Sequence, residues 1–199
     1  PHLHYTINKS DYASASQAIN PLMYFKNFKS NSGGLVGDDN YEKIWSYLTG
    51  VGGLTPYAAA GLMGAWQVES GNDPNTLEGY YYFPGGKSGD TVTNALKNYD
   101  SLDDFVQNKL FPAYRNDSSM NGKWNPNGYL DQSDGHYYPG LGLAQWTGGR
   151  TKNLLKYASS KNRTFNDLEM QLDFWKSEKE GAYSNTFSSA NNAVGTDRS

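Results

Sequence analysis

The sequence predicts a mainly α (α+β) domain with a small β region and a long polar insertion. Apolar residues recur at helical spacing in several segments, and the stretches between these segments are rich in Gly, Pro, Asn and Tyr. No apolar run approaches the roughly 20 residues that a membrane span needs. The 199 residues suit one compact domain and leave little for a second.

Two neighbouring segments carry the clearest helical signals. The first has apolar residues at the i, i+3, i+4 and i+7 positions of an amphipathic helix: Tyr41, Ile44, Trp45 and Leu48. The second begins with Thr55 as N-cap and Pro56 at the first helical position, and Ser70-Gly71 ends it. Its buried stripe is Ala59, Leu62, Met63 and Trp66. The many Ala and Gly residues of this second segment predict a central buried helix that a neighbouring helix approaches closely.

The remaining elements are weaker. We expect a helix capped by Ser101 and ended by Pro112, a short buried turn or strand at 140–146, a helix at 151–158, and a helix with Leu168, Leu172 and Trp175 as its stripe. The Tyr-rich stretch 80–83 predicts short β pieces within an insertion of about 75–138. We read 1–37 as an N-terminal arm with at most one short helix, around 14–25, and 38–199 as the folded domain.

Composition excludes several classes of function. A net charge of −3 argues against a nucleic-acid binder, and the absence of cysteine removes thiol catalysis and cysteine-ligated metals. Only three histidines occur, at positions 2, 4 and 136, so we expect no multi-His metal site, no Ser-His-Asp triad and no cofactor. The Asp131–His136 segment is similar to the start of a calcium loop. Its twelfth position is Gly142, where that loop needs Glu, so it predicts an ordinary Asp/Gly turn.

Glu69 is the candidate general acid. It follows Leu62 by seven positions and Trp66 by three, which places it on or beside the apolar stripe of its helix. It also lies in the last turn, where the helix dipole presents partial negative charge. Both settings favour the protonated form of a carboxyl group, which a glycosidase acid must keep until the leaving oxygen takes the proton. The alternative is that Glu69 turns outward into water at the helix edge.

Three sequence blocks occur in order along the chain. The first is Gly61-Leu-Met-Gly-Ala-Trp-Gln-Val-Glu-Ser-Gly-Asn-Asp-Pro74, preceded by an Ile-Trp-x-x-Leu helix. The second is Leu141-Gly-Leu-Ala-Gln-Trp-Thr147, and the third is Leu168-Glu-x-Gln-Leu-x-Phe-Trp175. Together they resemble the phage tail lysozyme family over roughly 40–180. The second block is also similar to goose-type lysozymes and lytic transglycosylases.

The resemblance implies a lysozyme-like domain that cleaves the β-1,4 bond between MurNAc and GlcNAc in peptidoglycan. Glu69 would be the catalytic acid, in a cleft between the end of its helix and the 142–146 segment. Gln145 would contact the glycan. Further candidates for substrate binding are Ser70, Tyr82, Tyr138 and Trp146, of which Trp146 suits the core equally well.

The same resemblance indicates where such a chain acts and on what. We expect bacterial peptidoglycan of a Gram-positive wall as the partner, with other phage tail proteins beside it, and no metal, nucleic acid or membrane. The location would be extracellular or virion-associated. The first residue is Pro and no apolar leader follows it, so we expect a processed chain or a piece of a longer one.

The second carboxylate is open at this stage. The preferred pair is Glu78 and Asp90, which lie where goose-type relatives place their β-region carboxylates. The remaining candidates are Asp73, Asp100, Asp131 and Asp134, each of which also suits an ordinary turn. Lytic transglycosylases need one carboxyl only, so the sequence leaves muramidase and transglycosylase as alternatives. A non-catalytic glycan-binding or structural tail module is the rival outside the enzymes.

Overall fold

The computed structural model describes residues 34–78, 101–110, 112, 129–185 and 188. Of these, 55% are helical and 4% lie in strand pairing, which confirms the mainly α prediction. The chain divides into two compact units, of which unit 1 comprises 1–72 and 172–199 and unit 2 comprises 73–171. The sequence did not indicate this subdivision. The predicted helix near 14–25 and the β pieces at 80–83 lie outside the described residues.

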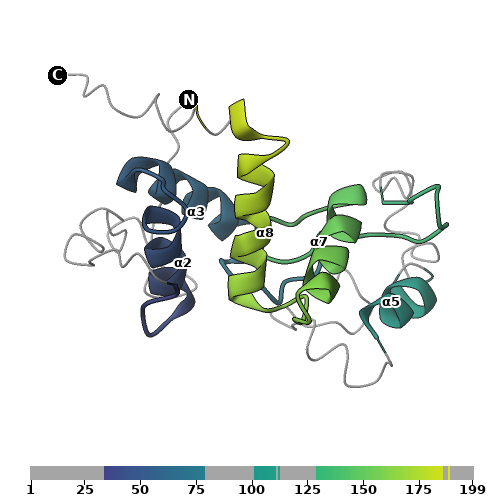
Figure 1. Cartoon of the computed structure of the whole chain (residues 1–199). Helices are drawn as coiled ribbons and strands as arrows, with labels where there is room; N and C mark the ends of the chain where they lie inside the picture. The colour runs from purple at the N-terminus through teal and green to yellow at the C-terminus, as the bar shows by residue number, and fades with distance from the viewer. Residues whose placement is uncertain (1–33, 79–100, 111, 113–128, 186–187, 189–199) are drawn as a thin grey trace. The chain divides into compact units, whose positions relative to one another are not determined.

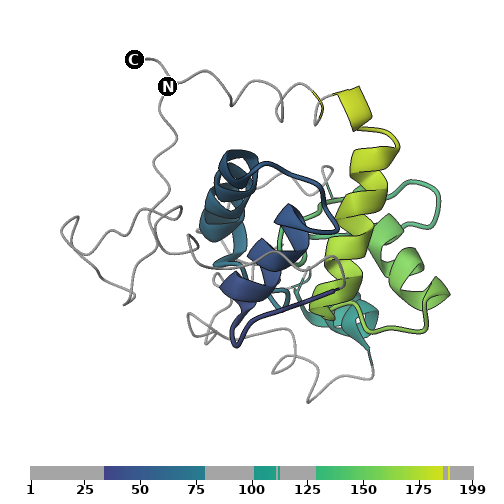
Figure 2. The same cartoon turned by 60° about the vertical axis from the view of Figure 1, so that its left-hand side comes forward.

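Unit 1 is built on α2 (Asn40–Thr49) and α3 (Pro56–Ser70), which lie side by side in both views (Figure 1, Figure 2). Asp39 caps α2 by accepting a hydrogen bond from the Glu42 amide, and Thr55 caps α3 by accepting one from the Ala58 amide. The N-cap predicted for α3 is therefore confirmed. Most described core residues of this unit come from both helices and from the C-terminal part of α8, among them Ile44, Trp45, Leu48, Met63, Trp66, Leu172 and Trp175.

The buried face of α3 differs from the predicted stripe. Ala59, Met63 and Trp66 are buried as expected, but Ser70 continues the buried face, whereas Leu62 is only half-buried. The helix is also exposed on its other side, where Val68 is 87% exposed. The prediction of a central buried helix is therefore wrong. Apolar Ala and Gly residues permit a close neighbour, but they do not require one on every face.

Unit 2 contains α5 (Leu102–Phe105), which continues as the π-helical turn η3 (Val106–Leu110), and α7 (Gly149–Ser160). Ser101 caps α5 by accepting from the Asp104 amide, as predicted. The helix α8 (Leu168–Glu180) begins in unit 2 and ends in unit 1. No helix in the described part of the chain is long and apolar enough to cross a membrane.

The small β region of unit 2 consists of isolated antiparallel bridges. Leu77 pairs with Leu141, and Leu141 pairs in turn with Trp146. A third bridge, between Leu130 and Tyr137, closes a hairpin whose tip is the Asp131–His136 turn. Leu141 and Trp146 are completely buried, so the prediction of a short buried segment at 140–146 is confirmed.

Candidate active site

Glu69 lies in the last turn of α3, as predicted, but its side chain is exposed. The buried face runs through Met63, Trp66 and Ser70, so Glu69 falls on the neighbouring solvent side. The expectation that Glu69 lies against the apolar stripe is therefore wrong, and the alternative of an outward side chain describes its position. Among the described residues its carboxylate has no hydrogen bond or ion pair.

The backbone that carries Glu69 is held by hydrogen bonds on both sides of that residue. The Tyr41 hydroxyl of α2 donates to Gln67 Oε1 at 2.6 Å, and the Asn72 side-chain amide donates to the same oxygen at 2.9 Å. Asn72 Nδ2 also lies 3.3 Å from the carbonyl oxygen of Met63. The α3 helix ends at Gly71, which has a left-handed φ of 68°. The last turn is therefore fixed while the Glu69 carboxylate remains available to a ligand.

Ser70 lies beside Glu69 but is buried. Its hydroxyl donates to the carbonyl oxygen of Trp66 at 3.0 Å, within the helix. Such a bond satisfies the hydroxyl locally. Contact of Ser70 with a glycan stays a prediction, and the geometry supports a helix-end role for this side chain.

Glu78 connects two parts of unit 2 through its carboxylate. Oε1 accepts from the Tyr129 hydroxyl at 2.7 Å, and Oε2 accepts from the Gly140 amide at 2.7 Å. The Glu78 amide in turn donates to the Gly140 carbonyl oxygen at 2.7 Å. Both oxygens of this predicted second carboxylate are therefore engaged by the protein. Asp90, the other preferred candidate, lies outside the described residues.

Gln145 lies in the same small β region, with a left-handed φ of 45°. Its side-chain Nε2 donates to the carbonyl oxygens of Thr76, at 3.2 Å, and Gly142, at 3.0 Å. Its Oε1 has no donor among the described residues. The amide group is thus held in one orientation, with its nitrogen used internally and its oxygen left to accept a hydrogen bond.

Trp146 follows Gln145 and is completely buried. A sugar can stack only on a ring face that it can reach, so the prediction of Trp146 as a substrate-binding residue is wrong, and its core role accounts for the burial. Tyr82 lies outside the described residues. The predicted cleft would join the α3 end of unit 1 to the 142–146 segment of unit 2, and it stays a prediction.

Tyr138 belongs to a polar cluster around Lys152 of α7. Lys152 Nζ lies 2.8 Å from Asp131 Oδ2 and 2.8 Å from Asp134 Oδ2, and it lies over the Tyr138 ring at 5.9 Å from the centroid. The Tyr138 hydroxyl donates to Asp134 at 2.9 Å. Burial, together with this hydrogen bond, raises the pKa of Tyr138 to about 12. One ring face therefore has a cation beside it, and sugar stacking on Tyr138 stays a prediction.

The Lys152 ammonium favours the charged form of the two carboxylates at the hairpin tip. Its hydrogen bond, followed by those from Ser133, lowers the pKa of Asp131 to about 2. The hydrogen bond from Lys152 also lowers the pKa of Asp134, and the two carboxylates raise the pKa of Lys152. Gly135 donates to the Asp131 carbonyl oxygen, which confirms the predicted Asp/Gly turn. Within the described ranges no three His, Asp or Glu side chains are grouped as metal ligands.

Among the other second-carboxylate candidates, Asp73 also acts within a turn. Its Oδ1 accepts from both the backbone and the side-chain amide of Asn75, each at 2.9 Å. Asp100 lies outside the described residues. The described candidates are therefore all hydrogen-bonded to the protein.

Gln171 of α8 is a buried polar residue whose role the sequence did not reveal. Its Oε1 accepts from the Leu143 amide at 2.9 Å, and its Nε2 donates to the carbonyl oxygens of Pro74, at 2.9 Å, and Phe165, at 2.7 Å. It joins three segments of unit 2 and is completely buried. The sequence feature that could have indicated this buried role is the position of Gln171 between Leu168 and Leu172, on the apolar face of the helix.

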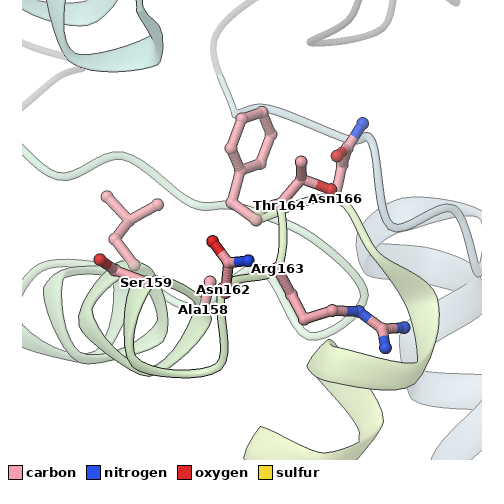
Figure 3. Close-up of a pocket in the computed structure, with 8 residues that line it drawn as sticks. Ala158, Ser159, Asn162, Arg163, Thr164 and Asn166 are labelled. Atoms are coloured by element: carbon pink, nitrogen blue, oxygen red, sulfur yellow. The ribbon is translucent and has the colours of Figure 1, made fainter.

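A separate hollow of about 630 Å³ lies where α7 leads into α8 (Figure 3). Its lining residues are Leu155, Ala158, Ser159, Asn162, Arg163, Thr164, Phe165 and Asn166. The Arg163 guanidinium points away from Asn162 in Figure 3 and pairs with Asp167 and Glu169. None of the predicted site residues lines this hollow, so it is not part of the candidate active site.

Comparison with known proteins identifies one family. The family model described as phage tail lysozyme matches residues 39–198. No curated protein and no solved structure matches the chain. The matched range contains both Glu69 and Gln145, and it begins close to the predicted boundary at 38.

Proposed function

Because the chain belongs to the phage tail lysozyme family, we propose that it hydrolyses the β-1,4 bond between MurNAc and GlcNAc with Glu69 as general acid. Family membership assigns lysozyme-like action on the bacterial cell wall in the context of a phage tail. The bond, the acid and a Gram-positive wall as target belong to the proposal. The observation that carries it is the exposed Glu69 carboxylate on a helix end whose backbone is fixed.

In the proposed reaction, Glu69 donates its proton to the glycosidic oxygen as the bond from that oxygen to the anomeric carbon breaks. A water molecule then adds to the anomeric carbon and gives up a proton. A glycan bound over the exposed carboxyl group would bring its glycosidic oxygen within reach of this proton. Gln145 Oε1 would accept a hydrogen bond from a hydroxyl or acetamido N–H of the strand, because its own nitrogen is already used.

A lytic transglycosylase is the second candidate function. In that reaction a hydroxyl of the sugar attacks in place of water, and one protein carboxyl suffices. The observation that favours it is the state of Glu78, whose two oxygens already accept hydrogen bonds from Tyr129 and Gly140. A hydrolase needs a further carboxylate, at about 5–5.5 Å for retention or 6.5–9.5 Å for inversion. Asp90 is the preferred candidate for that role.

The test is digestion of purified Gram-positive peptidoglycan, with the released fragments identified by mass spectrometry. We expect reducing MurNAc ends from the wild type and a loss of rate on the order of 10² to 10⁴ in Glu69→Gln. Glu180→Gln is the control, because Glu180 is also exposed at the C-terminal end of a helix in unit 1, although it pairs with Lys176. It should cleave like the wild type.

Two other outcomes would replace the proposal. Products with 1,6-anhydro ends, lost in Glu69→Gln, would establish the transglycosylase. Retained binding to the wall without cleavage, on several wall types, would instead identify a glycan-binding or structural tail module. Equal activity of wild type and Glu69→Gln would exclude Glu69 as the acid.

A further inference from the structure

The Glu78 carboxylate links, through hydrogen bonds, segments of unit 2 that are far apart in sequence. Tyr129, which donates to Oε1, is 51 positions away, and Gly140, which donates to Oε2, is 62 positions away. Tyr129 belongs to the hairpin and Gly140 begins the segment that carries Gln145. A charged acceptor forms stronger hydrogen bonds than a neutral one, so this half-buried carboxylate is well suited to hold both segments.

Gly140 brings Glu78 and Gln145 into the same small space. A Cβ added to Gly140 would lie 2.8 Å from Gln145 Oε1, 2.9 Å from Glu78 Oε2 and 3.0 Å from Glu78 Cβ. The first two distances are shorter than real Cβ contacts, so a side chain at position 140 would displace the ends of the Gln145 and Glu78 side chains. The Glu78 and Gln145 side chains therefore both lie next to the α-carbon of Gly140, and the position of one limits the position of the other.

The backbone next to Glu78 also orients Gln145. Thr76, two residues before Glu78, accepts from Gln145 Nε2 and from the Gly142 amide. The backbone of residues 76–78 and the Glu78 side chain thus act on the same segment from two directions. If the carboxylate is removed, we expect the Gly140 end of the segment to loosen and Gln145 Oε1 to lose its fixed position.

From this geometry we infer that Glu78 is a positioning residue, which holds the Gly140–Trp146 segment so that Gln145 Oε1 is presented to the glycan. The inference rests on the proposed function, because it assumes that a glycan binds there. It assigns Glu78 a different role from that of the second carboxylate in hydrolysis. A base or nucleophile needs an oxygen open to water or sugar, whereas Glu78 has a hydrogen bond on each oxygen.

Two substitutions at Glu78 separate the roles. In Glu78→Gln the new amide oxygen can accept from Gly140, and the amide nitrogen can donate to the Tyr129 oxygen, because a phenol both donates and accepts. In Glu78→Ala both bonds are lost. A positioning role therefore predicts that Gln recovers most of what Ala loses. A catalytic carboxylate predicts that Gln is as inactive as Ala.

We would measure kcat and KM on soluble peptidoglycan strands, and amide hydrogen exchange of Gly140 by NMR. We expect Glu78→Ala to raise KM on the order of tenfold, with kcat changed much less and Gly140 exchange accelerated. Glu78→Gln should recover most of the KM. Tyr129→Phe removes one of the two bonds and should show an intermediate KM, which keeps the test valid if the Ala variant does not fold.

Three results would overturn the assignment. Equal loss of kcat in the Gln and Ala variants would make Glu78 catalytic, as would recovery of the Ala variant by added azide. An unchanged KM in Glu78→Ala would show that the Gly140–Trp146 segment keeps its position without the hydrogen bond to Glu78. If the wild type does not cleave, binding of a soluble GlcNAc oligomer replaces KM, with the same order expected. A wild type that neither binds nor cleaves overturns the proposed function and this inference together, whereas a failure confined to the Glu78 variants overturns this inference alone.

Discussion

The end of α3 and the Gly140–Trp146 segment carry candidate site residues in two different ways. At the end of α3, Gln67 and Asn72 fix the backbone and leave the Glu69 carboxylate exposed without a partner among the described residues. In the Gly140–Trp146 segment, the candidate side chain itself forms internal hydrogen bonds, since Gln145 Nε2 is used by two carbonyl oxygens. At the end of α3, the residue proposed for catalysis is therefore not one of the residues that stabilise the fold. In the Gly140–Trp146 segment, the same side chain is proposed to bind the glycan and also forms hydrogen bonds that stabilise the fold. Mutations should reveal this difference.

The largest loss of stability is expected from Gln171→Met. The substitution keeps the volume but removes the hydrogen bonds of this side chain to the Leu143 amide and to the carbonyl oxygens of Pro74 and Phe165. Each such loss costs about 1–3 kcal/mol, so we expect a loss of about 3 kcal/mol or more in urea unfolding. The exposed Gln132→Met is the control, within about 0.5 kcal/mol of wild type. A loss below about 1 kcal/mol for Gln171→Met would show that this segment does not depend on its hydrogen bonds.

Gly142→Ala should cost somewhat less, about 2–4 kcal/mol. The residue has a φ of 72°, and an added Cβ would lie 2.4 Å from Gln171 Oε1. Gly135→Ala is a matched control, because Gly135 has a φ of 74° but no atom within 4 Å of an added Cβ. It should lose only the conformational part, about 1 kcal/mol. Equal losses in thermal unfolding would mean that Gln171 moves aside without cost.

Lys152→Met tests the polar hairpin tip through pH. The Lys152 ammonium, followed by the Ser133 hydrogen bonds, lowers the pKa of Asp131 from 3.8 to about 2. The stabilisation that acts through Asp131 is therefore complete above pH 3.8 and is lost as the pH falls toward 2. We expect the variant to be less stable at neutral pH and to approach the wild type near pH 2, as followed by circular dichroism. The exposed Lys156→Met should follow the wild type at every pH. A constant difference across this range would show that the ion pairs are not its source.

The smallest effect on stability is expected at the residue with the largest expected effect on cleavage. Glu69→Gln should keep the free energy of unfolding within about 0.5 kcal/mol of wild type, because the side chain is exposed and contacts no described partner. Thermal unfolding measures this directly. A loss above about 1 kcal/mol would mean that the carboxylate supports the fold, and the contrast between the two segments would disappear.

Sequence reasoning predicted the helices well because periodicity and capping are local. Thr55, Ser101 and Gly71 act at the positions where the pattern placed them. It was less accurate for side chains at the edge of a stripe. Whether Leu62 or Ser70 continues the buried face of α3 depends on the helices that pack against it, and this choice decides the exposure of Glu69.

The β region shows the same limit more strongly. The sequence indicated that 140–146 is buried, and Trp146 was assigned to the substrate although it lies in the core. The pairing of Glu78 with Gly140, 62 positions apart, has no local signal. The buried Gln171 also depends on three segments that meet only in the folded chain. Long-range hydrogen bonds of this kind are set by topology, which one sequence does not contain.

Gly142 and Gln171 occupy what is in effect one shared volume, and this ties their evolutionary histories together. An ancestor that gained a side chain at the first position would have had to shorten the second, and a shorter second residue would remove the steric part of the demand for glycine at the first, although the φ of 72° would still favour glycine. Across related chains the two positions should therefore change in concert, although they are 29 positions apart. Such covariation would indicate that related chains keep the contact between positions 142 and 171 in unit 2 even where the residues themselves differ.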